Sequence, residues 1–290
     1  MGNIKRNAVI MAAGTASRFV PLSAECPKGL LEVNGEILIE RQIRQLQEAG
    51  IDDITIVVGY KAEMFQYLKS KFVVDIVYNE DYYRYNNTSS IVRVIHKLSN
   101  TYICSSDNYF PKNVFQEEPI QSYYSALYAE GVTSEYCLTV DGNDNIVKVE
   151  VGGSDSWYMV GHVYFANNFS EVFSKLFISE YEREETKLGY WEDVYLRHIQ
   201  QLPLMKIHKY KNHEIEEFDS IDELRLFDNS YIHNTRSSII KSIANQLNCS
   251  ESKLNSFTRL KHDGDYLLFT FIKDGNTYLY NQLNQTIQKL

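Results

Sequence analysis

The sequence predicts an α/β protein whose main sheet is doubly wound and mostly parallel. Two short apolar runs, Ala8–Met11 and Ile54–Val58, stop just before Gly14 and Gly59, as buried parallel strands do where they enter a loop. Between them, residues 39–49 carry apolar side chains at helical spacing. A strand, helix and strand with short connections favour a Rossmann-like arrangement, in which ligands bind at the carboxyl ends of the strands.

The rest of the main domain continues this alternation. We expect a helix over 61–71, strands over 73–78 and 102–106, and helices over 89–98, 169–179, 191–200 and 222–227. Residues 122–166 alternate in a strand-like way, with turn signals at Asp141-Gly142 and Gly152-Gly153. This pattern predicts an antiparallel extension of the sheet.

A polar stretch at residues 229–234 marks the predicted end of the main domain, which spans 1–228. Beyond it, residues 235–290 predict a small α+β appendage. It combines an amphipathic helix with two strands joined by Lys273-Asp274-Gly275-Asn276, a good hairpin turn.

Composition limits the partners that the protein can bind. The chain has 290 residues, 44% of them hydrophobic, and a net charge of −9, so a full core is expected and duplex nucleic acid is not. Its four cysteines lie far apart, without the spacing of a zinc site. The N-terminal apolar run is too short for a signal peptide or a membrane span, which predicts a cytoplasmic protein.

The loop after the first strand carries groups that suit a triphosphate. Small residues at Ala12, Ala13 and Gly14 allow backbone N–H groups to approach phosphate oxygens closely. Arg18 can grip phosphates with its planar guanidinium, and Lys28 adds a compact positive charge. The loop fits neither the Walker pattern nor the dinucleotide-binding pattern. An ordinary loop with two solvated cations is the alternative.

The same loop resembles a known signature, G-x-x-x-R-x-x-P-L-(x)n-P-K, of the sugar-nucleotide pyrophosphorylase superfamily. Its fixed positions are all present: Gly14, Arg18, Pro21, Leu22, Pro27 and Lys28. The resemblance implies a nucleotidyltransferase that joins a nucleoside triphosphate to a phosphorylated substrate and releases pyrophosphate. Arg18 and Lys28 would then act on the phosphates.

The superfamily also implies a bound Mg²⁺ ion. Asp107 follows the strand predicted over 102–106, where a carboxylate meets the ligand-binding edge. By the resemblance, the second carboxylate comes from Glu192 or Asp193. For Asp107 the alternative is a turn or a helix cap, and for the other two it is an acidic helix start.

Further segments are similar to bacterial CTP:phosphocholine cytidylyltransferases. The run Tyr85-Asn86-Asn87-Thr88-Ser89-Ser90 is the most specific of them. By position, it implies that Gly59, Asn86, Asn87 and Ser89 hold the base and ribose of CTP. A polar loop that caps the following helix is the alternative.

Choline is a quaternary ammonium, which is recognised by aromatic rings and negative potential. Tyr136, Tyr190 and Trp191 are the predicted wall of such an acceptor site, with core packing as the rival for each. Two other functions stay open at this point. One is a nucleotidyltransferase for a sugar-1-phosphate or another phosphorylated alcohol, and the other is an inactive nucleotide-binding scaffold.

The appendage resembles the opening of a choline-kinase-like N-terminal lobe. The chain stops before a catalytic loop of such a kinase, so no kinase activity is expected. Its hairpin presents an edge that can pair with another chain, which predicts a homodimer; the alternative is a lobe that folds back on the main domain.

Overall fold

The computed structural model describes residues 5–261 and 266–290 and forms two compact units. The first unit runs up to Gly14 and continues from Ile39 to Glu217. The second joins residues 15–38 to the described part of 218–290. The chain therefore passes from one unit to the other three times.

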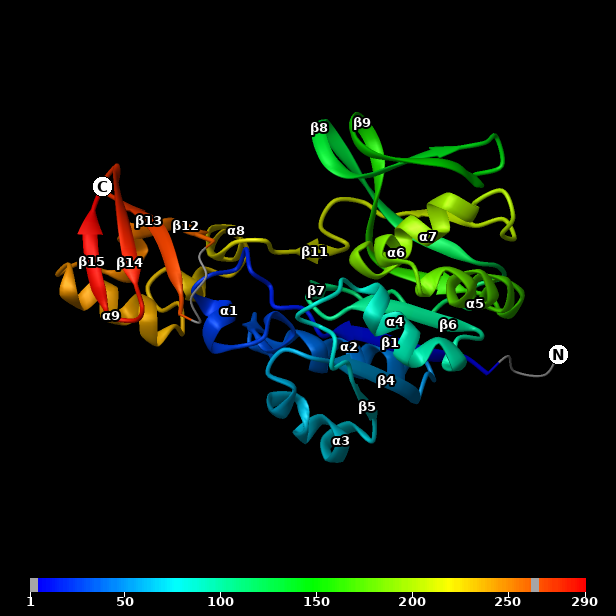
Figure 1. The fold of residues 1–290 in the computed structure, drawn as a ribbon, viewed down its shortest axis with the longest axis horizontal. Helices are drawn as coiled ribbons and strands as arrows, with labels where there is room; N and C mark the ends of the chain where they lie inside the picture. Colours follow the sequence, from blue (N-terminus) through cyan, green and yellow to red (C-terminus); the bar gives the residue numbers. More distant parts are fainter. Residues whose placement is uncertain (1–4, 262–265) are drawn as a thin grey trace. The chain divides into compact units, whose positions relative to one another are not determined.

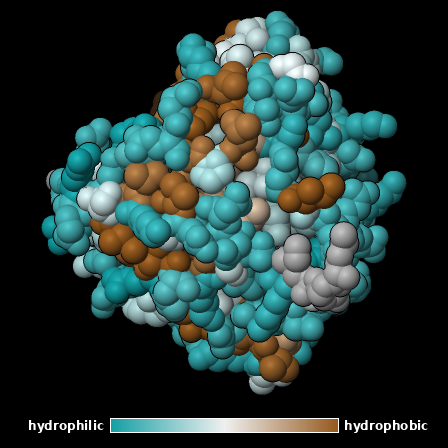
Figure 2. All heavy atoms as spheres, turned by 90° about the vertical axis from the view of Figure 1, so that its right-hand side faces the viewer, coloured by the Kyte–Doolittle hydropathy of each residue, from teal (hydrophilic) through white to brown (hydrophobic). Residues whose placement is uncertain are grey.

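The boundary predicted at residues 229–234 lies inside the second unit, and the division into domains stays a prediction. In the part of the chain that the structure describes, no helix is long and apolar enough to cross a membrane. Figure 2 shows a face of the molecule on which hydrophilic side chains predominate and hydrophobic ones gather in separate patches.

A seven-stranded sheet forms the centre of the first unit (Figure 1). Its strands are β1 (Asn7–Ala12), β4 (Asp53–Val58), β5 (Asp75–Tyr78), β6 (Thr101–Ser105), β8 (Tyr123–Val140), β9 (Ile146–Phe165) and β10 (Lys206–Lys209). Their order is β10-β8-β9-β6-β1-β4-β5. β6, β1, β4 and β5 are parallel, whereas β9 is antiparallel to β6 and to β8. The predicted fold class, with its antiparallel extension, is confirmed.

Helices cover the sheet in the first unit. They are α2 (Leu38–Glu48), η2 (Ala62–Phe65), α3 (Tyr67–Phe72), α4 (Thr88–Val94), η3 (Ile95–Lys97), α5 (Asn167–Tyr181), α6 (Glu184–Leu188) and α7 (Trp191–His198). On one face, side chains of α4, α5 and α7 form a single core with β6, β8 and β9. Phe165, Phe169, Phe173 and Trp191 lie within this core and are almost fully buried.

The opposite face of the same sheet is covered differently. Residues 111–121 form a loop there without helix or strand. Two short strands, β7 (Asn108–Tyr109) and β11 (Glu216–Glu217), pair as a separate two-stranded sheet. Helix α2 anchors the start of this loop. The Arg41 guanidinium donates from Nε to the Phe110 carbonyl and from Nη2 to the Pro111 carbonyl, each over 2.9 Å.

The helix predicted over 61–71 is divided in the structure. Residues 62–65 form the 3₁₀ turn η2, and α3 begins only at Tyr67. Lys61, just before η2, has a left-handed φ of 50°, which a regular helix does not accept. The apolar periodicity correctly predicted helical structure in this segment, but it did not predict the break between η2 and α3.

The second unit contains a four-stranded antiparallel sheet of order β12-β13-β14-β15. These strands are β12 (Leu254–Arg259), β13 (Leu268–Lys273), β14 (Asn276–Asn281) and β15 (Thr286–Lys289). The other elements are α1 (Leu22–Glu25), η1 (Lys28–Leu30), β2 (Glu32–Val33), β3 (Glu36–Ile37), α8 (Ile221–Phe227), η4 (Asn229–Tyr231), α9 (Ser238–Gln246) and η5 (Glu251–Lys253). The predicted hairpin is β13–β14, and the outer strands β12 and β15 were not foreseen.

Residues 15–38 join the C-terminal residues through specific contacts inside the second unit. The Glu25 carboxylate accepts hydrogen bonds from the Ser237 hydroxyl and, over 2.8 Å, from the Ser238 backbone N–H at the start of α9. The Tyr231 hydroxyl donates to the Glu32 carbonyl over 2.6 Å. The Tyr231–Glu32 bond joins residues that are 199 positions apart in the chain.

Candidate active site

Three predicted site segments meet at one edge of the large sheet. The parallel register pairs Ala12 of β1 with Val58 of β4, and β6 ends at Ser105 on the other side of β1. The loop that begins at Ala12, Gly59 after β4, and Asp107 after β6 all follow these strand ends. The structure therefore brings them to the carboxyl edge of the sheet, where open α/β sheets bind ligands.

The two glycines at this edge have different surroundings. A Cβ atom on Gly59 would lie 2.5 Å from the Cβ of Tyr82, so only glycine permits this close approach. A Cβ atom on Gly14 would meet nothing within 4 Å, and Gly14 is exposed. The Gly14 loop thus leaves room for a bound group, whereas Gly59 serves the packing of Tyr82.

Glu217 is a carboxylate beside Asp107 that the sequence reasoning missed. Asn108, the next residue after Asp107, pairs with Glu217 in the β7–β11 ladder. Both acids belong to the first unit, and this pairing places them near each other at the strand ends. Only the long-range pairing of two-residue strands reveals Glu217, and no local pattern in the sequence marks it.

Glu192 lies in a polar cluster next to the core of the first unit. Its Oε2 accepts a hydrogen bond from the Asn87 side-chain amide, and its Oε1 accepts one from the Tyr124 hydroxyl, each over 3.2 Å. Asn87 also accepts a 2.8 Å bond from the Trp191 backbone N–H. Burial raises the pKa of the Glu192 carboxyl to about 7, since the charged form loses its hydration there.

Asn86 and Ser89, predicted to hold the nucleotide, are part of the turn that starts α4. The Ser89 hydroxyl donates to the Asn86 carbonyl over 2.7 Å and accepts from the Asn79 side chain over 2.8 Å. Ser89 is fully buried. Ser89 therefore lies inside α4, whose N-cap is Asn87 without a side-chain capping bond, while Asn86 and Asn87 are half-buried.

Two of the predicted acceptor-site residues lie together with an acid. The Tyr136 hydroxyl donates to Asp193 Oδ1 over 3.1 Å, and the Tyr190 backbone N–H donates to Asp193 Oδ2 over 2.8 Å. The Tyr136 and Tyr190 rings are edge-to-face, 6.4 Å apart, and Tyr190 is 46% exposed. We call Tyr136, Tyr190 and Asp193 the tyrosine–aspartate cluster.

Trp191, the third predicted acceptor residue, is only 3% exposed. Its indole stacks on Tyr124 with ring centroids 5.9 Å apart and packs edge-on against Phe165 and Phe173. This is the core-packing alternative. Asp193 likewise takes part in the capping box of α7, the structural alternative that the acidic helix start left open.

The two predicted phosphate-binding cations lie together in the second unit. Arg18 Nη1 is 2.8 Å from Asp219 Oδ2, and Lys28 Nζ is 3.6 Å from Asp219 Oδ1. The Lys28 side chain is 9% exposed and its amine lies over the Phe19 ring, whereas the Arg18 side chain is 74% exposed. The structure therefore brings Arg18 and Lys28 onto one carboxylate, Asp219, which the sequence reasoning had not selected.

The oxygen donors of the site suit a hard divalent cation. Mg²⁺ takes one or two protein carboxylates and completes its coordination with substrate phosphates and water. Among the described residues, no group of three or more His, Cys, Asp or Glu side chains is arranged to hold a metal. Asp107 with one further carboxylate would supply the protein ligands that a Mg²⁺ ion shared with a nucleotide needs.

Comparison with known proteins gives this arrangement a family. Residues 8–134 match the family model of the MobA-like NTP transferase domain. The 2-aminoethylphosphonate cytidylyltransferase of Lancefieldella rimae is 36% identical over 237 residues, covering 80% of this chain and 96% of that protein. The choline-phosphate cytidylyltransferase of Streptococcus pneumoniae is 33% identical over 218 residues, covering 75% of this chain and 95% of that protein.

The fold agrees with these similarities. The solved structure of the CTP:phosphocholine cytidylyltransferase from Streptococcus pneumoniae matches with a TM-score of 0.75 at 32% identity. The match covers 78% of this chain and 99% of the other. The sheet, the strand-end loops and these relatives agree, and the chain belongs to the cytidylyltransferase family of nucleotidyltransferases.

Proposed function

We propose that the protein transfers the cytidylyl group of CTP to phosphocholine. A phosphate oxygen of the acceptor attacks the α-phosphorus of CTP, the bond to the pyrophosphate group breaks, and CDP-choline and pyrophosphate are the products. The acceptor needs no general base, because its phosphate dianion is already nucleophilic. In this proposal Arg18 and Lys28 bind the phosphates and stabilise the negative charge that develops during transfer.

The tyrosine–aspartate cluster is the observation that carries the choice of acceptor. It presents two aromatic rings and a carboxylate, and such surroundings favour an organic cation. The two oxygens of Asp193 already accept hydrogen bonds from Tyr136 and from the Tyr190 backbone. Each oxygen accepts one of these bonds, and the negative charge of the carboxylate is available to a trimethylammonium group, which needs no hydrogen-bond acceptor.

A second acceptor is 2-aminoethylphosphonate, which the Lancefieldella rimae relative is named for. It shares with phosphocholine a cationic nitrogen two carbons from the phosphorus-bearing end. Its primary ammonium has three N–H donors, so it needs acceptor atoms as well as negative potential. The two acceptors thus differ in what they require of Asp193.

Mg²⁺ is the proposed cofactor, held by Asp107 and a second carboxylate. When bound, the ion would neutralise charge on the phosphates and polarise the α-phosphate. Glu192 and Asp193 stay the predicted second ligands, and Glu217 joins them because of its pairing beside Asp107. Comparing Glu192→Gln, Asp193→Asn and Glu217→Gln separates these candidates. The true ligand is the one whose loss raises the Mg²⁺ concentration needed for half-maximal activity by about tenfold or more.

The decisive experiment measures pyrophosphate release for four nucleoside triphosphates against phosphocholine, 2-aminoethylphosphonate and common sugar-1-phosphates. We expect CTP with phosphocholine to give the highest kcat/KM. A preference for 2-aminoethylphosphonate would select the second acceptor. A preference for a sugar-1-phosphate would reject a cationic acceptor, and no release with any pair would favour the inactive scaffold.

The tyrosine–aspartate cluster can be tested directly. Replacing Tyr190 with Ala removes one ring, and we expect the KM for phosphocholine to rise about tenfold with little change in the KM for CTP. Tyr67→Ala is the matched control, because Tyr67 is also partly exposed, at 38%, but lies on α3 and bonds to Glu40. Equal effects of the two substitutions would contradict the assignment.

Two predictions about the whole protein belong to this proposal. The outer strands β12 and β15 of the second sheet each offer an edge for pairing, which supports the predicted homodimer. Light scattering after gel filtration would measure it. The likeness of residues 235–290 to a kinase lobe, and the cytoplasmic location, also stay predictions.

A further inference from the structure

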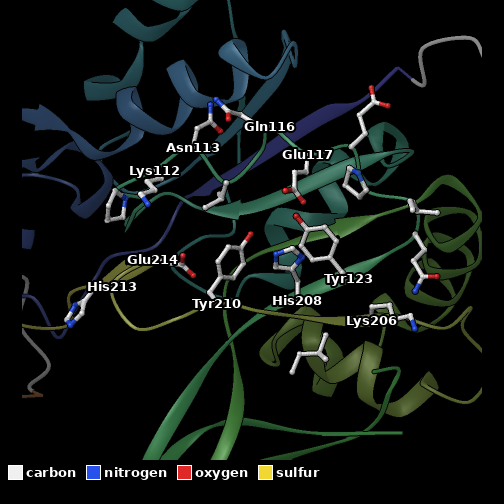
Figure 3. Close-up of a pocket in the computed structure, with 17 residues that line it drawn as sticks. Lys112, Asn113, Gln116, Glu117, Tyr123, Lys206, His208, Tyr210, His213 and Glu214 are labelled. Atoms are coloured by element: carbon white, nitrogen blue, oxygen red, sulfur yellow. The ribbon is translucent and has the colours of Figure 1, made fainter. Parts of the chain in front are cut away.

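A large cavity lies in the first unit and is separate from the groups described above. It encloses about 750 Å³, within the range of small-molecule sites. Its walls come from the loop of residues 111–121 and from residues 206–214, including β10 (Figure 3). Every residue that lines it belongs to the first unit.

Three neighbouring, mutually tilted rings form one wall of the cavity. The centroid of the His208 ring is 4.9 Å from that of Tyr123 and 4.6 Å from that of Tyr210, with tilts of 39° and 36°. Figure 3 shows these three side chains in a row along the cavity. Behind them, Nε2 of the buried His162 ring forms a 2.9 Å hydrogen bond with the Ser125 hydroxyl.

The cavity lies on the opposite face of the sheet from Glu192. Tyr123 and Tyr124 are consecutive residues of β8, and consecutive side chains of a strand point to opposite faces. Tyr124 packs on Trp191 and bonds to Glu192, while Tyr123 lines the cavity beside His208. A ligand in the cavity therefore does not occupy the tyrosine–aspartate cluster or the Glu192 site.

The charged groups around the rings favour a positive ligand. Figure 3 shows Glu117 directed toward Tyr123 and His208, and Glu214 beside Tyr210. Both carboxylates act electrostatically on His208, yet burial dominates and lowers the pKa of that imidazole below its ordinary value. His208 is thus neutral at pH 7 and leaves the negative charge of the two acids in place.

The cations nearby oppose this charge only weakly. The Lys206 ammonium donates a hydrogen bond to the Asn143 carbonyl, and His213 Nδ1 is 2.7 Å from Glu216 Oε1. Lys112 and Glu117 are both exposed, so solvent screens both charges, whereas Glu214 is half-buried and accepts a hydrogen bond from the Lys211 backbone N–H over 2.7 Å. A further lining acid, Glu118, is also exposed and lies 4.0 Å from Arg6. Neutral aromatic rings beside the carboxylates Glu117 and Glu214 are surroundings in which an organic cation can bind.

We propose that this cavity is a second ligand site, which binds a small organic cation of the quaternary ammonium class between the Tyr123–His208–Tyr210 wall and the carboxylates Glu117 and Glu214. The site does not depend on the identity of the acceptor in the transfer reaction, because it stands on the other face of the sheet. Bound there, the cation would be screened from water by the loop of residues 111–121.

The experiment uses the full chain and tetramethylammonium as the probe, since it carries no phosphate or hydroxyl. The ring signals of His208 are followed by ¹H–¹⁵N NMR, assigned with His208→Gln, while tetramethylammonium chloride replaces sodium chloride at constant ionic strength. We expect the His208 signals to shift and saturate in the wild-type protein. The double variant Glu117→Gln/Glu214→Gln should weaken this binding at least tenfold.

Two variants make the result specific. Glu130→Gln removes a carboxylate from the β8–β9 hairpin that is exposed as Glu117 is, and Tyr190→Ala removes a ring from the tyrosine–aspartate cluster. Both should leave the His208 titration unchanged, and thermal unfolding checks that every variant is folded. Absent shifts in the wild-type protein, or equal affinity in the double variant, would overturn the proposal. So would a stronger response to inorganic phosphate than to tetramethylammonium.

Discussion

The two faces of the large sheet carry the same kinds of side chain in opposite arrangements. On one face, Tyr124 and Trp191 are stacked in a closely packed core, and the acid Glu192 is partly buried beside them. On the other, Tyr123 and His208 line a cavity, and their acid, Glu117, is exposed. One strand, β8, supplies both tyrosines.

The covering element explains the difference. Helices α5 and α7 present rows of Phe and Trp side chains that interdigitate with one face. The loop of residues 111–121 has no such periodic row, so it spans the other face and leaves space beneath it. Burial then acts on both faces in the same sense, because it favours the neutral form of Glu192 and of His162.

The largest expected effect tests the packing contrast. Trp191→Ala should lower the free energy of unfolding by about 3–5 kcal/mol, because it opens a hole in a filled core. Tyr210→Ala removes a ring from the wall of an existing cavity and should cost about 1–2 kcal/mol. Urea unfolding of both variants measures the difference. Equal losses would mean that the two faces are equally well packed.

The next effect separates catalysis from binding in the cavity. Asp107→Asn removes the proposed Mg²⁺ ligand, and we expect kcat to fall roughly 100-fold or more. The same variant should bind tetramethylammonium at His208 as the wild-type protein does. A loss of both properties would show that the cavity and the strand-end site are one functional unit.

Glu192 should make the protein less stable as the pH rises. Its carboxyl has an unperturbed pKa of 4.5 and a pKa of about 7 in the folded protein. The folded state keeps a proton that the unfolded chain has lost, so the stabilisation present below pH 4.5 disappears as pH passes 7. The difference in unfolding free energy between wild type and Glu192→Gln should change by about 3 kcal/mol over this window. Unfolding is measured in a chelator, and no change in that difference would contradict the assignment.

His162 should have the opposite dependence and a smaller effect. Burial lowers the pKa of its imidazole from 6.5 to about 3. Below pH 6.5 the His162 imidazole binds a proton in the unfolded chain but not in the folded protein, so the free energy of unfolding falls with falling pH. Between pH 6.5 and 5 the loss is about 2 kcal/mol, and His162→Gln should abolish that slope. A retained slope would assign it to other groups.

Much of the fold was predictable because it rests on local patterns. The strands β1 and β4 and the helix α2 have uninterrupted apolar runs or helical spacing, and each was placed within one residue of its ends. The long β8–β9 hairpin followed from alternation between turn signals. The divided helix at residues 62–72 and the two-residue strands β7 and β11 were not predicted, since backbone geometry and distant pairing decide them.

The candidate site shows the same limit. The signature motif selected Arg18 and Lys28, and the position after a predicted strand selected Asp107, but Asp219 and Glu217 carry no motif of their own. Asp219 matters because folding brings it to both cations, across about 190 residues of sequence. Trp191 had two interpretations in the sequence, and only the surrounding Phe side chains identify it as a core residue.

The second unit combines an early and a late part of the chain, which affects when it can fold during synthesis. Residues 15–38 are synthesised well before their partners at residues 219, 231 and 237. The nascent chain can form most of the large sheet before these partners of the early segment are synthesised, so the long-range contacts form late. Enzymatic activity should therefore appear only after residues 219–238 have emerged from the ribosome.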